Sequence, residues 1–267
     1  MVFVALALLT PQAVGSTAIA YSFHNAKTLQ ISTLMTFSGD IPILGGQKGD
    51  ATASLEFHVH KLADTGKKLK FSEELTQFHV EFNQTVLPIS VQDAVKYFPK
   101  TSFEFDSGGT YRALSSPPKK VPVQLPGLSL VNVPRISFLP LQLPVGLGPK
   151  GSTGVYSEKV NGGVARFRLI IGDSAPMGTA INFTYSFERI GLEDAAEMLT
   201  TNRKDAVSKV AMTDHGKGLA VFSPSWGAII NVQMSDKAQY KVVNLSSHKT
   251  TYRHLVRKVF INVTPQS

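Results

Sequence analysis

Few residues of this sequence have a type and a spacing that could do chemistry, and the nearest to a metal site are His58 and His60. One residue separates them, so both imidazoles would lie on one face of a strand, as the first half of a metal site does. A hairpin turn at Asp64-Thr65-Gly66 would place Ser72 and Lys70 opposite them. Because a lysine beside the imidazoles opposes a bound cation and no third ligand is nearby, we expect no metal site.

Ser174 is the candidate for a catalytic nucleophile. The strand-like segment GGVARFRLII precedes it, and Gly172-Asp173-Ser174 resembles the nucleophile block of GDS-type esterases, in which a turn exposes the serine. In that family the block lies near the mature N-terminus and a downstream Asp-x-x-His completes the site, whereas this chain offers only Asp214-His215. The Asp-Ser-Ala-Pro sequence is more simply a β-turn. We therefore predict that the protein is not an enzyme, with a serine hydrolase that uses Ser174 and His215 as the alternative.

Two further stretches could contact phosphate, sugar or nucleic acid. Gly216-Lys217-Gly218 predicts a turn and not a phosphate loop, because no helix follows it. Trp226, the only tryptophan, stands in the turn sequence FSPSWGA, where it could bind a sugar or a headgroup or could cap the core. Aromatic residues make up 9% of the chain and are spaced as in strands, which does not favour a stacking platform for single-stranded nucleic acid. We expect neither a cofactor nor a nucleic-acid partner.

Period-two alternation of apolar residues dominates the chain and indicates the elements that position these residues. One example is KTLQISTLMTFSG, whose apolar positions include Leu29, Ile31, Met35 and Phe37. From residue 206 onward the sequence predicts a meander of short strands, with turns at His215-Gly216 and from Pro224 to Gly227. Short helices are expected only in SVQDAVKYFPK, with Ser90 as the N-cap, and in LEDAAEMLTTN. The predicted fold class is all-β, with curved antiparallel sheets.

The segment ATASLEFHVHKLADTGKKLKFSEEL predicts a hairpin with a definite register. A three-residue loop would place Val59 opposite Phe71 and Leu55 opposite Leu75. The apolar positions that continue the second strand are shifted by one residue in phase, which predicts a β-bulge near Thr76.

A weak internal repeat predicts the domain organisation. FEFDSGGTYRAL and AVFSPSWGAIIN share an aromatic strand end, a short polar turn with glycine and an outgoing strand. We therefore expect residues 1–20 to be a signal peptide, residues 21–115 and 151–267 to form two similar antiparallel halves, and residues 116–150 to connect them.

The connection is rich in proline and in apolar residues. Eight of the fifteen prolines lie between Pro117 and Pro149, so this segment can be neither helical nor a central strand. The favoured interpretation is a strap that packs along one sheet face, and the sharper one is a wall or lid of a cavity for an apolar ligand. In the second case the expected ligand contacts are Leu128, Leu130, Ile136, Phe138, Leu139, Leu141 and Trp226.

The N-terminal sequence and the charge predict where the protein works. An apolar run from Val2 to Leu9 and small residues up to Ala20 are typical of a signal peptide, and no later segment predicts a transmembrane span. The absence of cysteine favours the bacterial periplasm or the extracellular space over an exported eukaryotic protein. The net charge of +8 makes lipid headgroups and anionic envelope polymers the natural charged partners.

The late segment GKGLAVFSPSWGAIINVQMS, together with the meander and the lack of cysteine, resembles uncharacterised exported bacterial proteins that are similar to periplasmic lipoprotein carriers. The resemblance implies an antiparallel sheet curved around a hydrophobic cavity, with short helices and loops as a lid, and it transfers no functional residue. We therefore expect a non-enzymatic envelope protein that binds a lipid or another apolar ligand. The alternative is a structural protein that binds anionic envelope polymers through its basic face.

Overall fold

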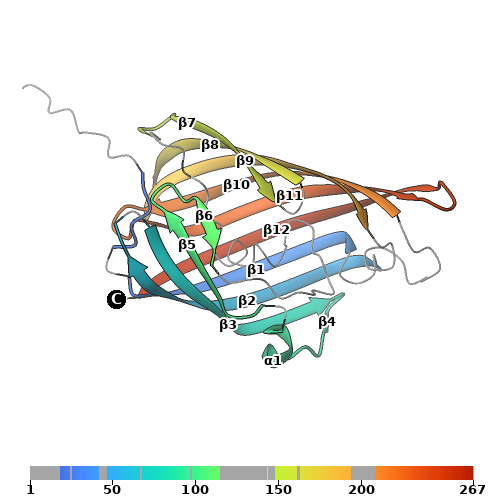
Figure 1. Cartoon of the computed structure of the whole chain (residues 1–267), viewed down its shortest axis with the longest axis horizontal. Helices are drawn as coiled ribbons and strands as arrows, with labels where there is room; N and C mark the ends of the chain where they lie inside the picture. Colours follow the sequence, from blue (N-terminus) through green and yellow to red (C-terminus); the bar gives the residue numbers. More distant parts are fainter. Residues whose placement is uncertain are drawn as a thin grey trace, which may run out of the picture.

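Every strand that the structure describes belongs to one curved antiparallel sheet (Figure 1), which confirms the predicted all-β class. The structure is a computed structural model, and it describes residues 19–24, 26–41, 47–66, 68–96, 98–114, 143, 148–160, 163–193 and 208–266. The first meander consists of β1 (Thr28–Ile41), β2 (Gln47–Asp64), β3 (Lys68–Phe82), β4 (Thr85–Val86), helix α1 (Val91–Ala94), β5 (Thr101–Asp106) and β6 (Tyr111–Ala113). The second consists of β7 (Thr153–Val160), β8 (Gly163–Ala175), β9 (Gly178–Glu193), β10 (Ser208–Ser223), β11 (Ala228–Asn244) and β12 (Thr250–Gln266).

The two meanders meet where the first strand pairs with the last. The order of strands is β6-β5-β3-β2-β1-β12-β11-β10-β9-β8-β7, with β4 paired to β3 outside this path. β1 and β12 are antiparallel from Thr28 opposite Gln266 to Gly39 opposite Leu255, which joins the meanders into a single sheet. That residues 21–115 and 151–267 are two copies of one layout stays a prediction.

Alternation along the strands gives the sheet two chemically different faces. On β1 the predicted apolar positions are all buried: Leu29, Ile31, Met35 and Phe37. The positions between them belong to the opposite face of the sheet. The same phase continues on β12, where the buried apolar residues are Leu255, Val259, Ile261 and Val263. We call the face that carries these buried residues the inner face and the opposite face the outer face.

An aromatic cluster closes one end of the inner face. The ring of Tyr21 lies 5.6 Å from that of Phe105 on β5 and 6.0 Å from that of Phe222 on β10, measured between centroids. The amide of Tyr21 donates to the carbonyl of Ser107 in the β5–β6 turn at 2.8 Å. Because β5 and β10 are separated by five strands in the sheet order, these contacts require the sheet to curl until its two arms approach each other.

The register of the β2–β3 hairpin is partly as predicted. The register shifts between Glu56 and Phe57, and the extra residue on the partner strand is Thr76, as predicted. The pairing nearer the turn is wrong, because Val59 lies opposite Glu73 and Leu55 opposite Phe78. The cause is the position of the turn, which lies later than predicted because Asp64 still belongs to β2 and pairs with Leu69. A second bulge at Leu62, whose exposed side chain gave no signal in the apolar pattern, moves the register back by one residue.

The predicted turn at His215-Gly216 does not exist, and Gly216-Lys217-Gly218 is not a turn either. β10 runs without interruption from Ser208 to Ser223, and β11 is likewise one long strand. The glycines serve another purpose: a Cβ at Gly216 would lie 2.0 Å from the Tyr185 ring, and one at Gly218 would lie 2.4 Å from the Phe183 ring. Two aromatic side chains of β9 therefore lie across β10 at positions where β10 has no side chain.

The other predicted local elements have different outcomes. The turn from Pro224 to Gly227 and the β5–β6 hairpin are confirmed, and so is the helix after Ser90, whose hydroxyl accepts from the Asp93 amide at 3.1 Å. The second predicted helix falls largely on residues 194–202, which lie outside the described residues. Within the described ranges no helix is both long enough and apolar enough to span a membrane.

Candidate ligand-binding face

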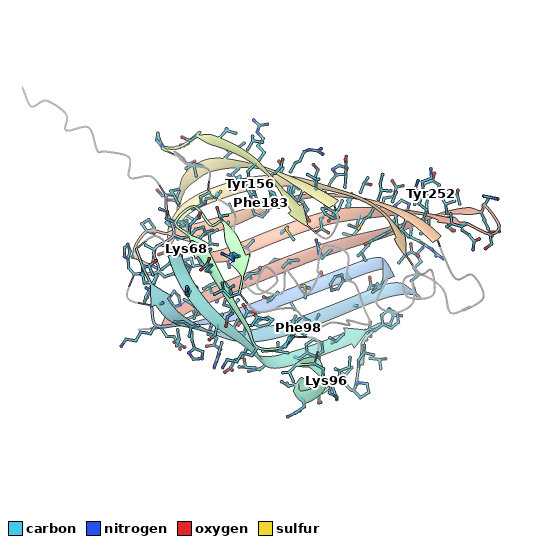
Figure 2. All side chains as sticks on the ribbon, in the orientation of Figure 1. Lys68, Lys96, Phe98, Tyr156, Phe183 and Tyr252 are labelled. Atoms are coloured by element: carbon cyan, nitrogen blue, oxygen red, sulfur yellow. The ribbon has the colours of Figure 1, made fainter. Side chains whose placement is uncertain are left out.

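The inner face is a broad apolar surface that the described elements cover only in part. The only helix of the described residues, α1, has four residues and leads to Phe98, whose ring lies 6.4 Å from Phe57 and 5.9 Å from Phe78 (Figure 2). All described strands belong to the same sheet, so the described part of the chain provides no second layer. An apolar sheet face is stable only when it is packed against something. The opposite arm of the sheet, the remaining chain or a ligand must therefore cover the rest.

A stack of aromatic rings lines the inner face of the second meander. Tyr156 on β7 stacks on Phe167 on β8 with centroids 4.8 Å apart, and Phe167 lies 5.6 Å from Tyr185 on β9. Figure 2 labels Tyr156, at the start of this stack, and Phe183, which lies two residues before Tyr185 on β9 and therefore on the same face. The stack leads from the edge strand toward a group of charged residues.

Those charged residues form a buried polar cluster in the apolar surface. The strand register places Tyr185, Gly216, Asp236 and Arg257 in one row across four strands. The Tyr185 hydroxyl donates to Asp236 across Gly216, and the Arg257 guanidinium donates to Asp236 with its Nε at 2.8 Å and also with an Nη nitrogen. Asp214 on β10 completes the cluster, with its Oδ2 3.6 Å from Arg257 Nη2.

The cluster has an imbalance of charge, because one arginine lies between two carboxylates. Asp214 and Asp236 are each 2% exposed and Arg257 is 5% exposed. Burial and the charge of Asp236 raise the pKa of Asp214 to about 6, against the lowering effect of Arg257. Burial likewise raises the pKa of Tyr185 well above its ordinary value, so its hydroxyl stays protonated and remains a donor. In the described structure Asp214 Oδ1 is buried and has no hydrogen-bond partner, which leaves one acceptor open on the inner face.

The sheet is similar to part of lipovitellin. A solved structure of lipovitellin that concerns its lipid–protein interactions matches with a TM-score of 0.55 at 12% identity, over 92% of this chain and 26% of lipovitellin. The chain thus spans about a quarter of the length of that protein, and the likeness shows a shared fold.

Two other solved structures match at TM-scores too low to indicate a shared fold. A DUF1329 family protein from Desulfovibrio piger has a TM-score of 0.23 at 7% identity, over 91% of this chain and 85% of its own. OpdQ from Pseudomonas aeruginosa has a TM-score of 0.26 at 10% identity, over 91% of this chain and 100% of its own. No protein-family model and no curated protein sequence matches the chain.

The structure places only one of the predicted ligand contacts. Leu128, Leu130, Ile136, Phe138, Leu139 and Leu141 lie outside the described residues. Trp226 lies in the β10–β11 turn, half-buried and packed against the core, and its carbonyl accepts from the His24 amide at 3.1 Å. It borders a pocket of about 790 Å³ that also touches Met177 and Val221.

Leu143, near the end of the predicted connection, is among the described residues, and it is anchored. Leu143 is 3% exposed, belongs to the hydrophobic core and donates its amide to the Gly108 carbonyl in the β5–β6 turn at 2.6 Å. At this residue the connection meets the end of the inner face that the aromatic cluster closes.

The structure contradicts the alternative of a serine hydrolase that uses Ser174 and His215. Ser174 pairs with Thr179, which in turn pairs with Phe222 on β10. His215 lies seven residues from Phe222 on that strand, which corresponds to roughly 23 Å at the rise of a β-strand. The turn also lies two residues later than predicted, since β8 continues to Ala175 and the turn comprises Pro176 and Met177.

The surroundings of the histidine pair also differ from the prediction. His58 lies opposite Glu74 and His60 opposite Ser72, so the lysine predicted beside them is not their neighbour. Glu74 is paired with Lys100 at 2.9 Å, which lowers the pKa of that carboxyl. Among the described residues no three potential ligands are grouped so as to hold a metal ion.

The sequence analysis did not identify the polar cluster, although a signal was present. In INVQMSDKAQYKVV the buried positions are Ile230, Val232, Met234, Asp236, Ala238, Tyr240 and Val242. Asp236 therefore occupies an inner position of an otherwise apolar series. A charged residue in the apolar phase of a strand would have predicted a buried ion pair.

Proposed function

We propose that the protein is a non-enzymatic carrier that binds a lipid or another apolar molecule on the inner face of its curved sheet. The observation that carries the proposal is an apolar inner face that extends across the sheet from β5 to β8, for which the described chain provides no second layer. The similarity to the fold of lipovitellin, whose structure concerns lipid–protein interactions, supports it.

The polar cluster gives the proposed site a place for the polar end of a ligand. Asp214 Oδ1 is an acceptor without a partner in the described structure, and the aromatic stack of Tyr156, Phe167 and Tyr185 leads to it along the same face. An apolar ligand with a hydroxyl group would satisfy this acceptor while its chain lies on the aromatic rings.

The proline-rich connection, residues 116–150, is proposed as the wall or lid of this site, with Leu128, Leu130, Ile136, Phe138, Leu139 and Leu141 toward the ligand. The anchor of Leu143 at the β5–β6 turn supports a course along the inner face. We further propose that the protein is exported to the bacterial periplasm or beyond, as the apolar N-terminal sequence and the lack of cysteine indicate.

The test compares two neighbouring residues of β10 that belong to opposite faces. Met212 is buried on the inner face, and Thr213 is exposed on the outer face. Met212→Trp fills space on the inner face, so we expect it to reduce the uptake of a fluorescent fatty acyl probe, whereas Thr213→Trp leaves uptake unchanged. Met212→Ala, which enlarges the site, should bind at least as much probe as the wild type. Equal uptake by all four proteins, each shown to be folded by circular dichroism, would place the probe elsewhere and refute the proposal.

A further inference from the structure

The outer face of the second meander has a strong excess of positive charge. Seven exposed lysines and arginines of β8, β10, β11 and β12 lie on this face. The exposed acids on the same face of the described strands β8–β12 are Glu188 and, in the β8 bulge, Asp173. The seven are Arg166, Arg168, Lys209, Lys217, Lys237, Lys241 and Lys258. Glu188 is paired with Arg166 at 3.6 Å and Asp173 with Lys150, so these acids neutralise little of the remaining surface.

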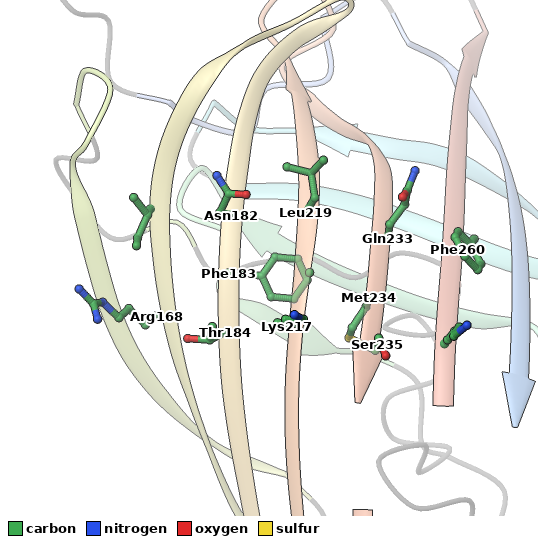
Figure 3. A pocket seen from close by; sticks show the side chains of 13 residues that line it. Arg168, Asn182, Phe183, Thr184, Lys217, Leu219, Gln233, Met234, Ser235 and Phe260 are labelled. Carbon is green, nitrogen blue, oxygen red and sulfur yellow. The ribbon is translucent and has the colours of Figure 1, made fainter. Parts of the chain in front are cut away.

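Three of these cations lie in one row at regular intervals. The register across β8 to β12 is Arg168, Thr184, Lys217, Ser235 and Lys258, so a hydroxyl residue separates each cation from the next. Figure 3 labels the first four of these residues. Neighbouring strands are about 4.8 Å apart, which spaces the cations by about 10 Å. Within the described residues none of the three is engaged in an ion pair. Each is therefore free to meet an external anion.

The next row on the same face has apolar residues on β8, β10, β12 and β1. It runs Ile170, Asn182, Leu219, Gln233, Phe260 and Leu34, from β8 to β1. The four apolar members are between 36% and 41% exposed. Except for Leu34, the members of the two rows line a shallow pocket of about 520 Å³ (Figure 3).

The outer face of the first meander is different. There the acids Asp50, Glu56, Glu74 and Glu81 are interspersed with the basic residues of β2 and β3. The one-sided charge is thus a local property of β8–β12 and is not a consequence of the net charge of +8 alone.

We propose that this outer face docks on the surface of an anionic lipid bilayer. Headgroup phosphates meet the row of cations, and the exposed apolar side chains reach into the boundary between headgroups and acyl chains. A soluble polyanion would bind the cations but would not contact the parallel row of exposed apolar residues. Because a lipid surface can bind both rows, the two rows together favour a lipid surface. The inference does not rest on a ligand at the inner face, although docking of this kind would bring a carrier to its source of lipid.

The experiment is flotation of the full chain with vesicles of phosphatidylcholine alone and of phosphatidylcholine mixed with phosphatidylglycerol. We expect binding only to the mixed vesicles, and its loss above about 0.3 M salt, where charges are strongly screened. Arg168→Gln/Lys217→Gln/Lys258→Gln should weaken binding about a hundredfold, since each cation near an anionic surface contributes roughly fivefold. The matched control is Lys48→Gln/Lys96→Gln/Lys100→Gln, which removes the same charge from exposed lysines of the first meander and should bind like the wild type.

The apolar row is tested with Leu219→Trp and with Leu219→Ser/Phe260→Ser. The new tryptophan should shift its emission to the blue on mixed vesicles, and the serine variant should bind them at least tenfold more weakly than the wild type. Equal loss of binding by both charge variants, equal binding to neutral vesicles, or unchanged binding of the folded serine variant would each overturn the proposal. The last result would identify the face as a site for soluble polyanions.

Discussion

The two faces of strands β9–β12 use charge in opposite ways, although the same strands supply both. On the inner face Asp214, Asp236 and Arg257 are buried among apolar residues and interact with one another and with Tyr185. On the outer face Lys217 and Lys258 are exposed and have no acid near them in the described structure. Removing a charge from the inner face should therefore lower the free energy of unfolding. Removing a charge from the outer face should weaken only the binding of an external partner.

The largest effect on stability is expected from Asp236→Ala. This change removes the carboxylate that accepts hydrogen bonds from the buried Arg257, and breaking a buried ion pair on one side costs about 3 to 5 kcal/mol. Urea unfolding of the full chain measures it. The neighbouring Lys237→Ala, on the outer face, is the control and should change the free energy of unfolding by less than about 0.5 kcal/mol. Similar losses for both variants would contradict the difference between the faces.

A smaller loss is expected from Gly216→Ala, because the new Cβ would lie 2.0 Å from the Tyr185 ring. The ring must move away from Asp236, and overpacking of this kind costs about 1 to 3 kcal/mol. If the ring is the cause, the same glycine change in a Tyr185→Leu background should cost much less. Additive effects in this double-mutant cycle would show that the strand itself requires glycine.

The pH dependence of stability should report on Asp214. Its pKa is raised to about 6 in the folded protein from 3.8 for the unfolded chain. The folded state therefore holds the proton more tightly, and stability falls as pH rises through this window. Compared with Asp214→Asn, which does not titrate, the wild type should lose about 1 to 3 kcal/mol between pH 4 and pH 7. Chemical unfolding of both proteins across this range tests the prediction, and parallel curves would place Asp214 outside the cluster's electrostatics.

The smallest effect on stability is expected at the outer face. Lys217→Gln removes an exposed charge that forms no ion pair in the described structure, so the free energy of unfolding should change by less than about 0.5 kcal/mol. Flotation with anionic vesicles should nevertheless show weaker binding. A clear loss of stability with unchanged vesicle binding would reverse the roles assigned to the two faces.

The sequence predicted the elements of the fold better than it predicted how they pair. Alternation revealed the inner positions of β1, and the shift in phase revealed the Thr76 bulge, because both leave a trace in the order of apolar residues. The bulge at Leu62 leaves no such trace, and the pairing of β1 with β12 joins residues more than 200 positions apart. Gly216 suggested a turn, but a glycine is needed there because the Tyr185 ring of the neighbouring strand occupies the place of a side chain. The candidate site escaped prediction for the same reason, since its four polar residues come together only through register.

The most direct test of the proposed carrier is native mass spectrometry of the full chain purified from cell envelopes under mild conditions. The account predicts a bound lipid, seen as added mass on the wild type and on Thr213→Trp but reduced on Met212→Trp. A wild type that arrives without added mass, and that takes up no lipid after incubation with a total lipid extract, would contradict the claim that the inner face binds a ligand.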